Sequence, residues 1–360
     1  MPSRLRARDR VQGPCLGAPA YGSAVTTPRL VVEEELLRRN IDRVAVGARV
    51  AGVALRPHVK THKCLEIARL QVAAGATGVT VATVGEAEVF VHAGFDDVLV
   101  AYPLWLDDDR ATRLARLAGR ARNAIGVDCT ESAARARAML PDVELMVEID
   151  SGHHRTGCAP GDVGEVAAAG GVRGAFTFPG HSYSPDGGSG AAADEARALA
   201  EAGKALVAAG VEAPVLSGGS TPSLAHTDTG VVTELRPGVY VLGDAQQWEL
   251  GSCSPDDIAL TCHATVVSLA GGRVVVDAGS KVLGADRAAY STGFGRLLDH
   301  PDARIVMLSE HHAVIEMAER PPLGTTLRLV PNHVCNAVNL ADELWVGDQR
   351  WSVAARGRNG

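Results

Sequence analysis

The sequence predicts an α/β fold, a closed (β/α)8 barrel followed by a C-terminal all-β domain. From about residue 27 to residue 243, short β-branched runs alternate with longer Ala-, Arg-, Glu- and Leu-rich stretches of helical period. Roughly eight such repeats fit here, and a closed barrel typically takes about 250 residues. Beyond residue 254 the helical stretches end, and short strands with turn signals take over.

The expected elements follow in chain order. Short β-branched runs predict parallel strands at residues 30–32, 53–59, 78–82, 97–101, 143–149, 174–178 and 215–217. Helical periodicity predicts helices at residues 33–50, 61–74, 107–121 and 191–209. Strands of the second domain are expected at residues 260–269, 273–277, 305–308, 313–317, 326–330 and 343–346. We therefore expect a flexible tail over 1–26, a barrel over 27–250 and a β domain over 251–360.

Composition excludes several classes of function. The chain has 360 residues, 46% of them hydrophobic and 21% charged, which is typical of a globular protein. Its net charge of −7 provides no overall positive field for nucleic acid. No run approaches the roughly 18 apolar residues of a membrane span, and the arginine-rich first ten residues lack the apolar core of a signal peptide. Seven scattered cysteines without a C-x-x-C pair favour reduced thiols, so we expect a cytoplasmic protein that acts on a small molecule.

Lys60 is the first candidate catalytic residue. It lies in the motif RPHVKTHK, directly after an apolar strand, and barrel enzymes keep their catalytic groups at the carboxyl ends of their strands. A lysine forms a Schiff base once burial or nearby cations lower its pKa. We expect those cations to be Arg56, His58, His62 and Lys63. Lys60 is therefore predicted to be an imine-forming nucleophile, and a solvated basic turn is the alternative.

Three further motifs fit a phosphorylated cofactor. SGGSTPS, at 217–223, places two glycines among hydroxyls between a strand and a helix, where backbone N–H groups can hold a phosphate. EIDSGHHRTG, at 148–157, ends another strand with Arg155 in a glycine-bounded loop that suits an oxyanion. ELRPGVY, at 234–240, offers the Tyr240 hydroxyl as a further donor. The alternatives are a plain turn, an exposed arginine and a packing tyrosine, respectively.

A candidate metal site lies in the motif PNHVCN, at 331–336. His333 and Cys335 are two residues apart, so on a strand both side chains would leave the same face. Imidazole and thiolate are the ligands that zinc prefers. Two ligands are too few for a closed structural site, but they leave a coordination position for a substrate oxygen. A chance pair is the alternative.

Taken together, the motifs RPHVKTHK, EIDSGHHRTG, GHSY, SGGSTP, ELRPGVY, SEHH and PNHVCN resemble those of the D-serine dehydratase and D-threonine aldolase group of pyridoxal phosphate (PLP) enzymes. These share the alanine racemase-like architecture, a PLP barrel followed by a β domain. The resemblance covers about residues 27–345. It implies that Lys60 would hold pyridoxal 5'-phosphate through a Schiff base, and that Arg155 would contact the phenolic oxygen of the cofactor.

The resemblance also assigns the remaining site residues. His333 and Cys335 would bind Zn²⁺ or another divalent cation, and His181 of GHSY would lie near the substrate β-hydroxyl, as in the aldolase branch. Phe176 and Phe178 stand where relatives often have polar residues, which leaves the partner of the cofactor ring nitrogen open. A homodimer is expected, because related active sites lie between one barrel and the partner's β domain. The cofactor site would also include Tyr183, Ser217, Gly218, Gly219, Ser220, Thr221 and Tyr240.

Two reactions compete on a D-3-hydroxy amino acid, and placement of the reacting groups decides between them. If Lys60 removes the α-proton while a metal polarises the β-hydroxyl, β-elimination gives a 2-oxo acid and ammonia. If a base such as His181 removes the hydroxyl proton, the Cα–Cβ bond breaks and gives glycine and an aldehyde. The His-x-Cys pair resembles the dehydratase branch, whereas aldolases more often show His-x-Asp.

We therefore expect a D-serine or D-threonine dehydratase, with D-threonine aldolase as the alternative. A racemase is less favoured because its second-base motif is not evident in the β domain. A non-catalytic PLP-binding protein of the same barrel fold is the alternative from a different class. The extra β domain with His333 and Cys335 counts against it.

Overall fold

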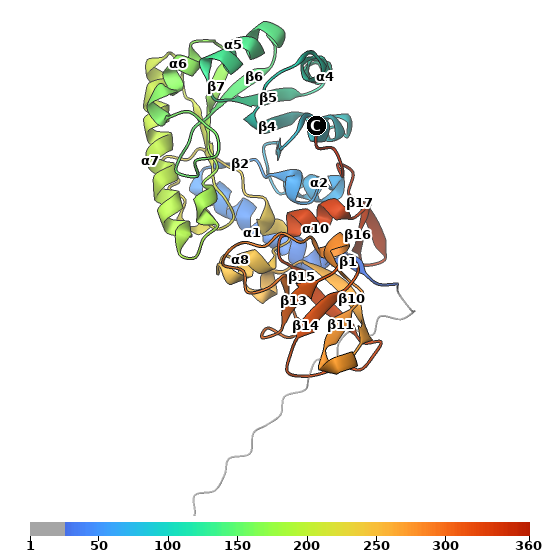
Figure 1. The fold of residues 1–360 in the computed structure, drawn as a ribbon. Coiled ribbons are helices and arrows are strands. Elements are labelled where there is room, and N and C mark those ends of the chain that lie inside the picture. Colours follow the sequence, from blue (N-terminus) through green and yellow to red (C-terminus); the bar gives the residue numbers. More distant parts are fainter. Residues whose placement is uncertain (1–25) are drawn as a thin grey trace, which may run out of the picture.

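The computed structural model describes residues 26–360, which form a barrel and a β domain joined side by side (Figure 1). The predicted fold class is thereby confirmed. The expected flexible tail, residues 1–26, lies outside the described residues except for Thr26.

Eight parallel strands form the barrel sheet, in the order β2-β9-β8-β7-β6-β5-β4-β3. A parallel bridge between His58 and Thr80 joins the two edge strands and closes the ring. Inside it, Leu99, Met146 and Phe176 form a small buried core. The strands are β2 (Ala54–Leu55), β3 (Val79–Val81), β4 (Asp97–Pro103), β5 (Arg122–Val127), β6 (Glu144–Glu148), β7 (Val172–Phe176), β8 (Val215–Gly218) and β9 (Glu234–Leu235).

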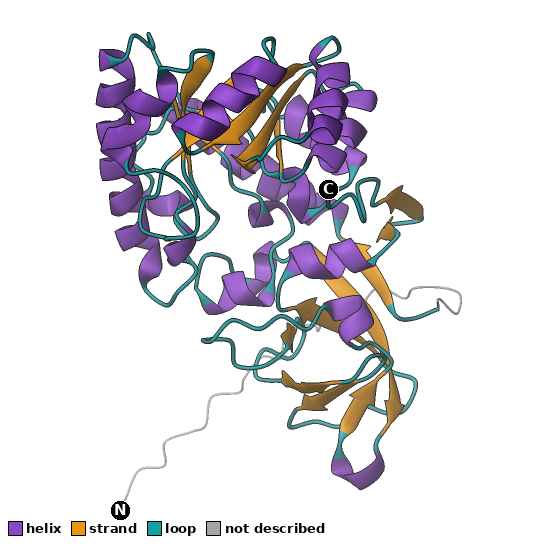
Figure 2. Cartoon of the chain, turned by 45° about the horizontal axis from the view of Figure 1, so that its top comes forward, coloured by secondary structure: helices purple, strands orange, loops and turns teal. Residues whose placement is uncertain are grey.

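Helices cover the outside of these strands (Figure 2). The first of them, α1, begins with two acidic residues that suit a helix N-terminus and ends at Gly52, whose φ of 69° favours glycine. Its buried Leu37, Ile41, Val44 and Ala48 recur at helical spacing and face the barrel. The helices are α1 (Glu34–Ala51), α2 (Leu65–Ala73), α3 (Val84–His92), α4 (Asp108–Ala118), α5 (Thr130–Met139), α6 (Val163–Ala167), α7 (Gly187–Ala208) and α8 (Ala245–Glu249).

A buried ion network ties the ends of the barrel strands together. Arg56 is 1% exposed, and its Nε lies 2.8 Å from Glu234 Oε2 while its Nη1 lies 2.7 Å from Asp97 Oδ1. These carboxylates raise the pKa of Arg56 above its usual value, although burial alone would lower it. Arg56 therefore joins β2, β4 and β9 rather than facing Lys60.

Replacing Arg56 with leucine should lower the free energy of unfolding by about 3–5 kcal/mol, because the buried Glu234 would lose its charged partner. Urea unfolding measures this change. Arg38→Leu is the control, since Arg38 pairs with Glu34 on the exposed face of α1 and should contribute only about 0.3–0.5 kcal/mol. Equal unfolding midpoints for the two variants would contradict the assignment.

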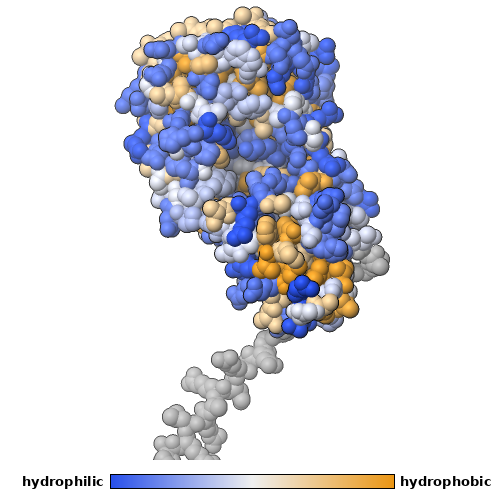
Figure 3. Space-filling model, viewed as in Figure 1, coloured by the Kyte–Doolittle hydropathy of each residue, from blue (hydrophilic) through white to orange (hydrophobic). Residues whose placement is uncertain are grey.

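The β domain is a nine-stranded sheet in the order β11-β14-β13-β12-β15-β10-β1-β16-β17, with β10 also paired to β11. Apolar residues gather on the face of this domain that Figure 3 shows. Val306 and Met307 of β13 are 42% and 48% exposed. The elements are β1 (Arg29–Val32), β10 (Leu260–Ser268), β11 (Val274–Val276), α9 (Ser280–Leu283), β12 (Gly295–Leu297), β13 (Arg304–Leu308), β14 (Ala313–Glu316), β15 (Thr326–Pro331), α10 (Val334–Leu340), β16 (Glu343–Val346) and β17 (Gln349–Ser352).

Two expectations about this domain are wrong. The strand expected at 30–32 was assigned to the barrel, but β1 pairs antiparallel with β10 and parallel with β16. Helices do not end at residue 254, because α9 and α10 follow. The chain also returns to the barrel after β17, where the Gly85 N–H donates to Gly360 O over 2.9 Å.

Within residues 26–360, no helix has the length and apolar character that crossing a bilayer requires.

Candidate active site

Lys60 lies on the short 3₁₀ turn η1 (Val59–Thr61), the next element along the chain after β2. The turn brings it to a cavity of about 550 Å³ that both domains line. Its Nζ lies 5.7 Å from the centre of the Phe178 ring, which follows β7. The predicted nucleophile is therefore at the carboxyl end of the barrel, facing this cavity.

Two side chains from the loop after β6 also contact the Phe178 ring. The Arg155 guanidinium carbon lies 5.4 Å from the ring centre, and the His153 ring meets Phe178 edge-on at 5.6 Å. Arg155 itself is exposed and lies 3.8 Å from Glu148. The structure thus brings Arg155 and Lys60 to the same aromatic ring.

Burial lowers the pKa of Lys60, and the nearby charges of Arg155 and Arg236 lower it further. The negative charge that Cys335 and Glu86 can carry acts in the opposite direction. A lowered pKa increases the share of neutral amine, which is the form that attacks a carbonyl or accepts a proton. Lys60 therefore has the electrostatic setting that a Schiff-base lysine needs.

The predicted source of this effect is wrong. Burial lowers the pKa of both His58 and His62, that of His62 to about 4, so neither is a cation at neutral pH. Lys63 Nζ is 3.2 Å from Glu86, which neutralises it, and Arg56 is held by Glu234. The charges that act on Lys60 instead come from other strand ends.

Glycines line one end of the cavity. Gly219 has a φ of +88°, and a Cβ at Gly238 would lie 2.6 Å from Thr61 Oγ1. Ser220 and Thr221 line the same wall. Glycine at position 238 therefore lets its loop pack closely against the Lys60 turn, and a wall of glycines and hydroxyl groups suits a phosphate.

Part of the predicted phosphate cradle is turned elsewhere. The Ser217 hydroxyl donates to Glu234 Oε1 over 2.7 Å and accepts from Arg236 Nε over 2.8 Å. Gly218 continues β8 beside it, and neither residue lines the cavity.

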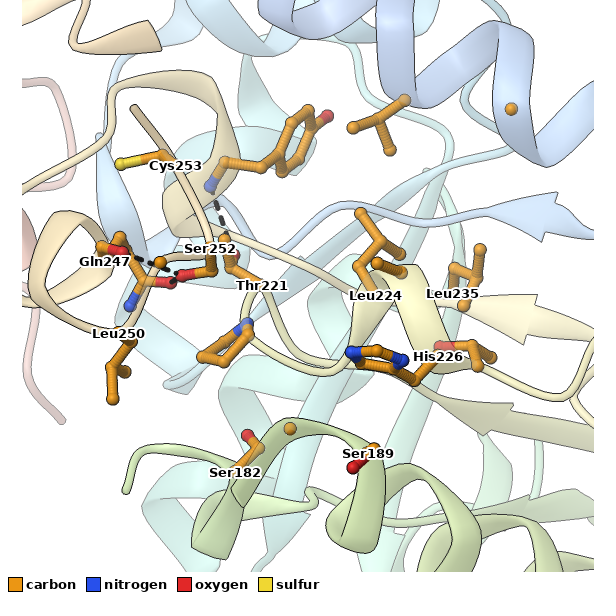
Figure 4. Close-up of a pocket in the computed structure, with 18 of the residues that line it drawn as sticks. Ser182, Ser189, Thr221, Leu224, His226, Leu235, Gln247, Leu250, Ser252 and Cys253 are labelled. Atoms are coloured by element: carbon orange, nitrogen blue, oxygen red, sulfur yellow. Dashed lines mark hydrogen bonds between the residues drawn. The ribbon is translucent and has the colours of Figure 1, made fainter. Parts of the chain in front are cut away.

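Tyr240 is also directed away. It lines a second cavity of about 700 Å³, to which Thr221 also contributes (Figure 4). Its backbone N–H donates to Thr221 Oγ1 over 3.2 Å, and its buried hydroxyl accepts from Gln71 over 3.0 Å. Tyr240 therefore supports Thr221 through its backbone, while its hydroxyl is engaged outside the Lys60 cavity.

His181 lies outside the residues that line the Lys60 cavity, whereas Tyr183 and His153 are among them. The His181 Nε2 is 3.2 Å from Asp194 on α7. His153 has its pKa lowered by burial and by the charges of Arg155 and His181. The catalytic role predicted for His181 stays a prediction, and His153 is the histidine of this region that faces the cavity.

His333 and Cys335 line the cavity opposite the barrel, but they are not on a strand. His333 is the residue before α10, and Cys335 lies in its first turn. Buried Asp244 explains why a helix forms here instead of the expected strand. Its carboxylate accepts the Val334 N–H over 3.1 Å and so caps the N-terminus of α10. Cys335 Sγ is 3.5 Å from Thr61 Oγ1, next to Lys60.

The donor set of this pair fits a divalent metal. Burial opposes ionisation of Cys335, yet His333, Thr61 and Lys60 together hold its pKa below the usual value. Cys335 and Asp286 in turn raise the pKa of His333 to about 11, against the effect of burial. A thiolate and an imidazole that would yield its proton are a borderline-soft pair suited to zinc. Across residues 26–360 no group of three or more His, Cys, Asp and Glu side chains is placed to hold a metal.

Asp286 orients His333, since its Oδ2 lies 2.7 Å from Nδ1 and leaves the other ring nitrogen for a metal. Asp286→Asn should weaken metal binding about 10–100-fold. Competition with a chromophoric chelator measures this affinity. Asp299→Asn is the control, because Asp299 pairs with Arg328 on the surface of the β domain. An unchanged metal affinity in Asp286→Asn would contradict the role.

Three residues of this site were missed by the sequence reasoning. Arg236 lines the cavity, donates to the Thr177 carbonyl and lies over the Phe176 ring. Its signal was present, as an arginine after a strand in ELRPGVY. His153 also had a signal, beside Arg155 in EIDSGHHRTG. Asp286 had none, because it reaches His333 from 47 residues upstream.

Comparison with known proteins places this fold and site in a family. The model of the alanine racemase N-terminal domain matches residues 32–246, so the chain belongs to this family of PLP-dependent proteins. The serine dehydratase domain matches residues 259–347, over most of the β domain.

The relatives include both dehydratases and an aldolase. D-threo-3-hydroxyaspartate dehydratase of Delftia sp. is 34% identical over 86% of this chain and 90% of the relative. Its structure has a TM-score of 0.83 at 32% identity, covering 91% of this chain and 97% of that one. D-serine dehydratase of Dictyostelium discoideum is 28% identical over 86% and 90%. The D-threonine aldolase structure from Filomicrobium marinum has a TM-score of 0.82 at 32% identity, over 92% and 96%.

Proposed function

We propose that this chain is a PLP- and divalent-metal-dependent lyase acting on D-3-hydroxy amino acids, with dehydration as its reaction. The observation that carries the proposal is that Lys60 and the His333–Cys335 pair, from different domains, line one cavity. An imine-forming amine and an open metal site together can promote β-elimination of a hydroxyl group.

Lys60 would hold PLP, with Gly219, Ser220, Thr221 and Gly238 at the phosphate end and Arg155 near Phe178. When bound, PLP withdraws electron density from the substrate α-carbon. Arg236 is the buried cation of the same cavity, and its hydrogen bond to Ser217 fixes its position. It is our candidate for the group that the sequence left open opposite the ring nitrogen.

The chain's own residues then divide the work. The amine of Lys60, kept partly neutral by burial, accepts the α-proton. His333 and Cys335 would hold a Zn²⁺ ion, which would polarise the β-hydroxyl as a Lewis acid. Loss of the α-proton and of hydroxide from the substrate gives, after hydrolysis, a 2-oxo acid and ammonia.

Dehydration is favoured over aldol cleavage by the metal ligands. A structure of the Delftia dehydratase carries a cysteine-to-alanine change and is in the metal-free form, and another carries a histidine-to-alanine change two positions earlier. The same His-x-Cys spacing occurs here at His333 and Cys335. His181, the base predicted for aldol cleavage, is paired with Asp194 outside the cavity lining, whereas His153 faces the cavity.

Product analysis tests the proposal. The purified protein, supplied with PLP and Zn²⁺, is incubated separately with D-serine, D-threonine and D-threo-3-hydroxyaspartate. We expect ammonia and the matching 2-oxo acid, which is 2-oxobutanoate from D-threonine. Glycine and acetaldehyde from D-threonine would instead establish the aldolase, which is our second candidate because a D-threonine aldolase from Arthrobacter sp. is 30% identical over 98% of this chain. Unreacted substrate in all three samples would overturn both.

A further inference from the structure

Helix α7 places a buried carboxyl group directly behind the glycine loop at 217–221. Glu195 is 0% exposed, and its Oε1 accepts the Gly219 N–H over 2.7 Å. A Cβ on Gly218 would lie 2.4 Å from the same oxygen, so the carboxyl group is packed against the loop backbone. Glu195 is absent from the residues that line the Lys60 cavity, whereas Gly219 is among them. The acid therefore supports the loop without facing a ligand.

This arrangement costs stability, which calls for an explanation. The second oxygen of Glu195, Oε2, is buried and has no hydrogen-bond partner among the described residues. Burying an ionisable group that is only partly hydrogen-bonded is unfavourable, and burial raises the pKa of Glu195 to about 7. An apolar side chain of similar size would pack here without that cost. What the carboxyl group supplies is one strong acceptor for one backbone amide.

That acceptor fixes the orientation of the loop. With its N–H held by Glu195, Gly219 adopts a φ of +88°, and the chain then turns Ser220 and Thr221 to the cavity. Ser220 is held in turn by Ser182 and Ser223, each 2.8 Å from its hydroxyl oxygen. The Gly219 N–H is thus bonded to Glu195 on the side of the loop away from the cavity, and does not itself face the phosphate site.

We propose that Glu195 is a positioning residue for the cofactor phosphate, acting by holding the Gly219 amide so that the following residues present the phosphate site. This inference rests on the proposed PLP dependence. It predicts a selective effect, because only ligands that carry the phosphate use the loop. The affinity for PLP should depend on Glu195, and the affinity for pyridoxal, which lacks the phosphate, should not.

The test compares Glu195→Leu, which removes the acceptor, with Glu195→Gln, which keeps a carbonyl oxygen there. Dissociation constants of PLP and pyridoxal are measured by absorbance titration of the cofactor-free proteins. We expect Glu195→Leu to weaken PLP binding about tenfold or more, as for loss of a hydrogen bond to a charged group. Pyridoxal binding should stay unchanged, and Glu195→Gln should bind PLP nearly as the parent does. Glu201→Leu, an exposed position on α7, is the control.

Each remaining outcome is decisive. Equal weakening of PLP and pyridoxal would overturn the proposal, since it indicates general damage to the cavity. Unchanged PLP binding in Glu195→Leu would overturn it as well, and so would a Glu195→Gln variant as weak as Glu195→Leu. If the parent protein binds neither PLP nor pyridoxal, the proposed function itself fails. This result differs from every outcome that concerns Glu195 alone, because those outcomes require a parent protein that binds PLP.

Discussion

Lys60→Ala should abolish the visible absorption band of lysine-linked PLP and lower turnover at least about 10²–10⁴-fold, the range that a positioned proton-transfer group contributes. The physical reason is that Lys60 provides both the bond to the cofactor and the proton acceptor, in a position where burial lowers its pKa. Spectra and rates of product formation are recorded on the variant after incubation with PLP. Borohydride reduction followed by peptide mass spectrometry then identifies the modified lysine in the parent protein.

Lys204→Ala is the matched control, because Lys204 is exposed on α7. It should keep both the absorption band and the turnover of the parent. A Lys60→Ala variant that retains a lysine-linked band would refute the assignment of Lys60. A label found on Lys63 would point to the neighbouring lysine, which also lines the cavity.

Loss of the metal should have the second-largest effect. A Lewis acid supplies several kcal/mol to a developing charge, so removal by a chelator should lower turnover on the order of 10³-fold. Cys335→Ala should have the same effect, because it leaves His333 as the single protein ligand among the residues that line this wall. Metal content by atomic absorption is measured in parallel with turnover.

Added Zn²⁺ should restore the chelated parent but not Cys335→Ala. Cys158→Ala is the thiol control, since burial raises the pKa of Cys158 to about 11 and it lies outside the cavity lining. Full turnover in metal-depleted protein would remove the metal from the reaction.

Several buried strands were predictable from local patterns, whereas β5 and β9 were not. The strand expected at 143–149 contains β6, whose centre at 145–147 is apolar because both faces of the strand are covered. In contrast, β9 consists of Glu234 and Leu235 alone, and its glutamate is buried only because Arg56 compensates its charge. No local pattern encodes that compensation, since it depends on a residue 178 positions away.

The candidate site was predictable for a different reason. Lys60, Arg155 and Thr221 each follow a parallel strand, and the carboxyl ends of such strands meet at one edge. The direction of a side chain, however, is decided by contacts that the sequence does not display. Tyr240 is turned by Gln71 and His181 by Asp194, while the helix that carries Cys335 begins where Asp244 caps it.

The position of β1 also constrains the order in which this protein can fold. Val31 of β1 pairs with Trp345 of β16, so the first strand of the sheet needs one of the last strands as a partner. During synthesis nearly the whole barrel leaves the ribosome before β1 finds either neighbour, and its edge stays open until then. Pairings of such large sequence separation are slow to form. A fragment that ends between the barrel and the β domain would therefore contain β1 without the strands it pairs with. The barrel and the β domain are thus expected to fold as one unit.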